Sequence, residues 1–169
     1  MSAIDQLLRN NASYVHDPAV GALPSRPRLE VAVLACMDAR IDVHRVLGLA
    51  PGEAHVIRNA GGVVTDDVIR SLLISQRLLG TREVMVIHHT ECGMQSFRDE
   101  ELKAEIEKEV GVRPPFALGS FSDLREDVRE SIRRILSSPF LAHKDRVRGF
   151  IYDVRTGRLE EVSLQGRTG

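Results

Sequence analysis

The chain has 169 residues, of which 43% are hydrophobic, 28% charged and 4% aromatic. This length and composition are typical of a single globular domain with a sizeable core, and they argue against a fibrous or disordered chain. The net charge is −1, from 23 Lys and Arg against 24 Asp and Glu, so the chain lacks the excess of cations on which nucleic-acid binding by bulk charge depends. We therefore expect no nucleic-acid partner, and no membrane either, because no apolar run is long enough to cross a bilayer.

The first 28 residues differ in pattern from the rest of the chain. Residues 3–14 predict a short helix with its apolar side chains on one side. Residues 16–28 contain three Pro and one Gly, which predicts an extended linker rather than a helix. The N-terminus carries acidic and amide residues where a signal peptide has an apolar core, so we expect a cytoplasmic protein.

After this arm, strands alternate with helices. Buried strands are predicted over 29–36, 55–60 and 83–89, and helices over 43–49, 65–79, 96–110 and 123–136. A terminal β-hairpin follows, over 147–154 and 158–164. This alternation predicts an α/β fold whose central sheet is mostly parallel, with an antiparallel edge strand and helices on both faces. We expect residues 1–169 to form one domain, with 1–28 as its N-terminal arm.

The two cysteines and one histidine lie where the predicted strands end. Cys36 is the last residue of the first strand, His89 ends the third, and Cys92 follows three residues later. If these two strands are neighbours in a parallel sheet, the three side chains converge at one edge. Two thiolates and an imidazole suit zinc, and three protein ligands leave the fourth position of a catalytic zinc open. Zinc there lowers the pKa of a bound water to about 7.

A carboxylate and a guanidinium stand beside the first cysteine. Alternate residues of an extended segment share a face, so Asp38 and Arg40 can pair at the mouth of the metal site. A carboxylate held by Arg40 can accept a hydrogen bond from a hydroxide on the metal and orient it. Released from Arg40, Asp38 can instead bind zinc as a fourth ligand and close the site. The simpler alternative is a surface ion pair that contributes little.

The pattern C-x-D-x-R, followed about fifty residues later by H-x-x-C, resembles the β-class carbonic anhydrases, and RNAGGVVTDDVIRSL (58–72) is similar to that family's stretch between the two motifs. The resemblance is closest to the short actinobacterial type. It implies zinc held by Cys36, His89 and Cys92, a dyad of Asp38 and Arg40, and a backbone N–H of Gly93 that helps hold bicarbonate. It also implies reversible hydration of carbon dioxide by a homodimer or homotetramer in which each N-terminal arm packs on a partner subunit.

Two departures from the family pattern leave alternatives open. His88 stands where the family commonly has Gly before the zinc-binding histidine, and residues 24–30 contain no substrate-binding Gln. Relatives of this fold hydrolyse carbonyl sulfide or carbon disulfide, so the same zinc site predicts those substrates as the first alternative. The second alternative is a non-catalytic zinc- or redox-sensing protein that uses the two thiols as a reactive pair. His88 itself is expected to be structural, because it points away from His89 if the strand continues.

Overall fold

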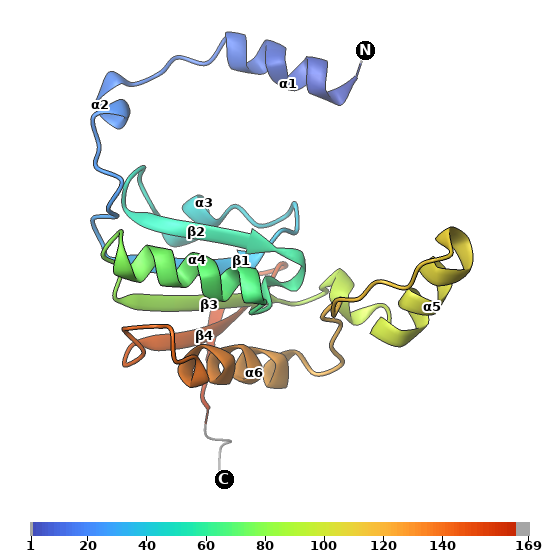
Figure 1. Cartoon of the computed structure of the whole chain (residues 1–169). Helices are drawn as coiled ribbons and strands as arrows, with labels where there is room; N and C mark the ends of the chain where they lie inside the picture. Colours follow the sequence, from blue (N-terminus) through green and yellow to red (C-terminus); the bar gives the residue numbers. More distant parts are fainter. Residues whose placement is uncertain (1, 165–169) are drawn as a thin grey trace.

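The computed structural model describes residues 2–164, and it begins with an arm that stands away from the sheet (Figure 1). Helix α1 (Ala3–Ala12) starts after Ser2, whose hydroxyl accepts the backbone N–H of Asp5. The predicted N-terminal helix is therefore confirmed, although it ends at Ala12 rather than at residue 14. None of its residues is buried.

The prediction of an extended linker over 16–28 is wrong at one point. A single helical turn, α2 (Pro18–Gly21), interrupts the linker. Asp17 begins it, because its carboxylate accepts the backbone N–H of Ala19. Proline is compatible with this turn because it occupies the first helical position, where a backbone N–H has no partner within the helix.

A five-stranded sheet with the order β2-β1-β3-β4-β5 forms the centre of the molecule. Its strands are β1 (Val31–Cys36), β2 (Ala54–Asn59), β3 (Glu83–His89), β4 (Val147–Tyr152) and β5 (Leu159–Val162). The first four are parallel, and β5 pairs antiparallel with β4, which confirms the mostly parallel sheet and its terminal hairpin. The pairing of β1 with β3 brings together the ends of the two strands that carry Cys36 and His89.

Helices cover both faces of this sheet, as the alternation predicts. They are α3 (Val43–Leu47), α4 (Asp66–Arg77) and α6 (Leu124–Ser137), whereas α5 (Asp99–Val110) covers neither face. On one face, Leu72 of α4 and Ile135 of α6 pack with Leu34 of β1. On the other face, Val43 of α3 packs with Val33 of the same strand. Because successive side chains of β1 point to opposite faces, both faces are apolar and buried.

Helix α5 lies away from the sheet, on the side opposite to the arm's entry (Figure 1). It begins at Asp99, three residues later than the predicted start at 96, and none of its residues is buried. The carboxylate of Asp99 accepts the backbone N–H groups of Leu118, Gly119 and Ser120, so it ties the returning chain to the start of the helix. Within residues 2–164, no helix combines the length and the apolar character that crossing a membrane requires.

Candidate metal centre

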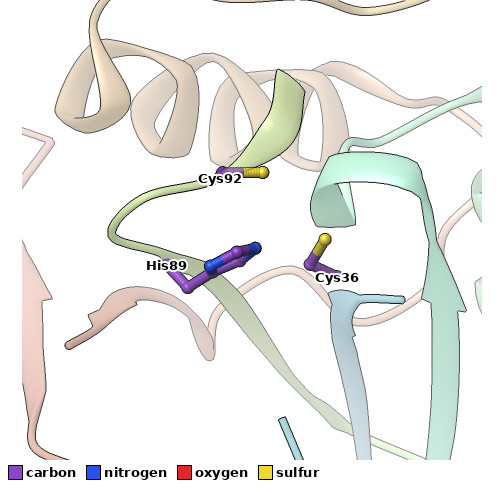
Figure 2. Close-up of side chains that lie close together, drawn as sticks. All are labelled: Cys36, His89 and Cys92. Carbon is purple, nitrogen blue, oxygen red and sulfur yellow. The ribbon is translucent and has the colours of Figure 1, made fainter. Parts of the chain in front are cut away.

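The three predicted ligands meet at the carboxyl ends of β1 and β3. Cys36 ends β1, His89 ends β3, and Cys92 lies in the loop that follows, directly before the short turn η2 (Gly93–Gln95). The potential ligand atoms of Cys36, His89 and Cys92 all lie within 4.8 Å of one another. Figure 2 shows the two sulfurs and the imidazole ring pointing toward a common point. The three side chains therefore converge as predicted, because β1 and β3 are neighbouring parallel strands.

The donor set fits a thiophilic metal such as zinc. Cys36 and Cys92 are 4% and 6% exposed and form no disulfide, and His89 is fully buried. The Nδ1 of His89 lies 2.9 Å from the carbonyl oxygen of Thr90, which accepts its proton. This leaves Nε2 as the ligand atom, and Nε2 is buried without a hydrogen-bond partner among the described residues. A histidine oriented by a backbone carbonyl, with its second nitrogen unpaired beside two thiols, has the form of a zinc ligand.

The surroundings of the two thiols differ. Burial raises the pKa of Cys36, but the adjacent His89 imidazole and hydrogen bonds from the backbone of Asp38 and Gly61 outweigh it and lower that pKa to about 7. Burial raises the pKa of Cys92 to about 11, and the negative charge of Cys36 adds to the effect. Although burial opposes it, Cys36 raises the pKa of His89. One thiolate therefore forms readily near neutral pH, while the second requires a cation to replace its proton.

Asp38 and Arg40 form the predicted pair at the mouth of this site. The Arg40 Nε and Nη2 donate to the two carboxylate oxygens of Asp38 at 2.9 and 2.8 Å, and the backbone N–H of Arg40 donates to Oδ1 at 2.9 Å. The Asp38 Oδ2 lies 3.8 Å from the Nε2 of His89, so the carboxylate borders the ligand set. Its bidentate bonds to Arg40 hold the pKa of Asp38 well below its usual range, although partial burial opposes the shift.

Two contacts that the sequence did not predict fix this geometry. Arg58 of β2 donates to the carbonyl oxygens of Cys36 and Asp38 at 2.9 and 2.8 Å, so it holds the turn after β1. The Arg40 Nη2 also donates to the carbonyl of Glu91, at 3.0 Å, between the two ligands of the second motif. The signal for Arg58 was a charged residue near the carboxyl end of an apolar strand. The contact to Glu91 had no signal, because a backbone carbonyl has no sequence signature.

Gly93 and the Gly61–Gly62 turn complete the surroundings. Gly93 directly follows Cys92, and nothing lies within 4 Å of the position that a Cβ would take there. Gly62 has a φ of +67° and packs against the backbone of β1 and β3, so the two glycines form a tight turn.

The fold and the site together define an α/β protein with a buried three-ligand centre of the Cys2His type. The family model described as carbonic anhydrase matches residues 31–114. The chain is 54% identical over 163 residues to β-carbonic anhydrase 1 of Mycobacterium tuberculosis, covering 96% of this chain and 99% of that protein. The chain therefore belongs to the β-carbonic anhydrase family.

Two further relatives are less similar to this chain. A carbonic anhydrase structure from Streptococcus mutans is 42% identical, with a TM-score of 0.85 and coverage of 96% of this chain and 99% of that one. A carbon disulfide hydrolase of Acidianus sp. is 33% identical over 182 residues, covering 94% of this chain and 88% of that protein. The predicted fold and family are thus confirmed.

Proposed function

We propose that this chain binds zinc through Cys36, His89 and Cys92 and catalyses the reversible hydration of carbon dioxide to bicarbonate and a proton. The observation that supports this most directly is the buried convergence of these three side chains beside the Asp38–Arg40 pair. The 54% identity to a β-carbonic anhydrase over nearly the whole of both chains supports the choice of reaction.

Each residue of the site has a defined task in this proposal. When bound, zinc supplies a water whose pKa is lowered to about 7, so that a nucleophile is available at neutral pH. Asp38 stays ionised, because Arg40 stabilises its charge, and its carboxylate would accept a hydrogen bond from that water and orient it toward carbon dioxide. The backbone N–H of Gly93, directly after Cys92, would hold the bicarbonate product, and the space where a Cβ of residue 93 would lie is open.

The test is stopped-flow hydration of carbon dioxide by protein whose zinc content is measured in the same sample. We expect about one zinc per chain and rapid hydration, and Asp38→Asn should retain zinc while losing most of the turnover. Stoichiometric zinc without hydration of carbon dioxide would overturn the proposed reaction and leave the metal site standing. Reversible thiol oxidation with release of zinc, again without turnover, would favour the sensing alternative.

Hydrolysis of carbon disulfide or carbonyl sulfide is the second candidate. Four carbon disulfide hydrolases are 32–36% identical to this chain, so proteins similar to it act on a different linear electrophile. Turnover of carbon dioxide, carbonyl sulfide and carbon disulfide by one preparation separates the two candidates. We expect carbon dioxide to be preferred, since the identity to the carbonic anhydrase is the higher.

Asp38 also gives the site a proposed closed state. Its carboxylate is held by Arg40 in this structure, but it lies close enough to the ligand set to serve as a fourth ligand if Arg40 releases it. We propose that hydroxide displaces Asp38 as pH rises, so that activity increases from neutral to alkaline pH. A flat rate profile over that range, with zinc retained, would refute this switch.

A homodimer or homotetramer is proposed from the arm. Ile4, Leu7 and Leu8 of α1 are 63–68% exposed, and such an apolar face is costly in water unless another surface covers it. We propose that the arm of residues 1–28 packs on a partner subunit and that the assembly is cytoplasmic, where its thiols stay reduced. Light scattering on the full chain should give the mass of a dimer or tetramer, and Leu7→Glu with Leu8→Glu should lower it. An unchanged mass would refute the role of the arm.

A further inference from the structure

The proposed reaction makes no use of His88, although this residue lies directly before a metal ligand. His88 is fully buried, and because successive side chains of a strand alternate, it points to the opposite face of β3 from His89. Its Nε2 lies 3.0 Å from the carbonyl oxygen of Gly62, and because a carbonyl can only accept, Nε2 carries the proton and donates. Its ring stacks on Phe121, with centroids 5.9 Å apart.

The carbonyl that His88 binds belongs to a turn in contact with Cys36. A Cβ built on Gly62 would lie 2.9 Å from the backbone nitrogen of Cys36 and 3.0 Å from the carbonyl carbon of Ala35. The turn therefore rests on the end of β1 with no space between them. The backbone of the adjacent Gly61 lowers the pKa of the Cys36 thiol, which places it beside the sulfur. A shift of this turn would move a donor away from a metal-binding thiolate.

Helix α6 packs against His88 from the other side. The carboxylate Oδ2 of Asp127, whose side chain is 17% exposed, lies 3.0 Å from Nδ1, and neither atom has a hydrogen-bond partner among the described residues. The hydroxyl of Ser131, one turn further along, lies 3.5 Å from Nε2. The ring is thus fixed between a helix and the Gly61–Gly62 turn, and its loss would leave the buried Gly62 carbonyl without this donor.

We propose that His88 is a positioning residue for the metal ligand Cys36: its hydrogen bond to the Gly62 carbonyl holds the Gly61–Gly62 turn against the Cys36 sulfur. The inference rests on the metal site of the proposed function and not on the identity of the substrate. It also gives a reason for histidine at a position where glycine, with no side chain, could make no such bond.

Two amide variants of different length test this role. His88→Gln places an amide nitrogen where Nε2 lies and retains the bond to Gly62, whereas His88→Asn is one methylene too short to do so. Gln76→Asn is the matched control, because Gln76 is also buried and donates to a backbone carbonyl, that of His143 at 2.8 Å, far along the chain from the metal ligands. Asp127→Ala removes the contact to Nδ1 independently.

Three measurements are made on each full-length variant: zinc affinity by competition with a chelator, the thiolate-to-cobalt absorption of the Co²⁺-substituted protein, and urea unfolding of the metal-free protein. Loss of a group that orients a ligand typically weakens metal binding about 10–100-fold. We expect His88→Asn to lose at least about tenfold in zinc affinity and to shift the cobalt spectrum, while His88→Gln stays close to wild type. Gln76→Asn should lose stability but keep both metal readouts, and Asp127→Ala should follow His88→Asn.

The failure of this inference is distinguishable from the failure of the proposed function. Wild-type protein without stoichiometric zinc would overturn the proposed metal site and this inference with it. Wild-type protein that binds zinc, beside a His88→Asn variant with unchanged affinity and spectrum, would overturn the inference alone. If His88→Asn does not fold, unchanged metal readouts in Asp127→Ala, or losses in Gln76→Asn as large as those in Asp127→Ala, would overturn it equally.

Discussion

Replacing Gly62 by alanine should cost far more than the same change at Gly48, although the two glycines have nearly the same φ angle. Their φ angles are +67° and +65°. An L-residue in this left-handed region costs roughly 1–2 kcal/mol, and both variants incur that cost. At Gly48 nothing lies within 4 Å of the new Cβ, so the backbone cost is the entire loss of stability expected in Gly48→Ala.

At Gly62 the new methyl group has no space. It would lie 2.9–3.0 Å from backbone atoms of Ala35, Cys36 and Ile87, and a strand backbone cannot rotate away as a side chain can. Overpacking of this kind costs about 1–3 kcal/mol more, for a total of about 2–5 kcal/mol in Gly62→Ala. That is a large part of the 5–15 kcal/mol that typically stabilises a domain. Relief by movement of β1 would displace Cys36.

Urea unfolding of the zinc-free variants measures the two costs, and chelator competition measures zinc affinity. We expect the free energy of unfolding to fall by about 1–2 kcal/mol in Gly48→Ala and by about 2–5 kcal/mol in Gly62→Ala. Only Gly62→Ala should weaken zinc binding. Equal losses of stability in the two variants, or unchanged zinc binding in Gly62→Ala, would refute the reasoning that the turn is wedged against the metal-binding strand.

Three further predictions concern protons and charges. Zinc affinity should rise from pH 6 to pH 9, and zinc binding should release protons, because burial raises the pKa of the Cys92 thiol to about 11 and the thiol keeps its proton until zinc replaces it. Calorimetry in two buffers of different protonation enthalpy measures the protons released. A pH-independent affinity would contradict the prediction. Arg40→Gln should keep zinc but lose turnover, since the pKa of Asp38 then returns toward its usual value and the carboxylate is free to bind the metal. Zinc content and stopped-flow hydration of the variant test this. Wild-type turnover would contradict a role for the Asp38–Arg40 pair. Asp99→Ala should destabilise the protein by about 2 kcal/mol at pH 7 and by less at pH 3. Although burial opposes the shift, hydrogen bonds from Ser120, Gly119 and Leu118 lower the pKa of Asp99 to about 2. The stability that its carboxylate contributes is therefore present above its unfolded pKa of 3.8 and is lost as pH falls toward 2. Urea midpoints at both pH values test this, and an equal loss at pH 3 would contradict it.

The elements that the sequence predicted best are those whose signals are local. The strand over 83–89 has the predicted bounds, and the apolar run at its centre is the local signal that marks it. Helix α4 starts where Thr65 accepts the backbone N–H of Val68, a cap that the sequence shows directly. Helix α5 was placed three residues too early, since the carboxylate of Asp99 bonds a loop about twenty residues away, and that contact depends on tertiary structure.

The site divides in the same way. Cys36 and His89 were predictable because both end strands, and strand ends of a parallel sheet meet at one edge. Their meeting still required β1 and β3 to be neighbours, which the order of strands in the chain does not determine. The role of Gly61 and the contact between His88 and Asp127 were not predictable. Each depends on which helix and which turn pack over the end of β3, and neither has a pattern of spacing that would mark it.

Arg40 shows why the two motifs of this site act as one. Its guanidinium donates to both carboxylate oxygens of Asp38 in the first motif and to the backbone carbonyl of Glu91 in the second. Three bonds in fixed directions require the planar fork of arginine, because the single ammonium of lysine cannot match two carboxylate oxygens and a carbonyl at once. The residue that holds Asp38 therefore also holds the loop between His89 and Cys92, so the geometry of the dyad and that of the metal ligands cannot vary independently.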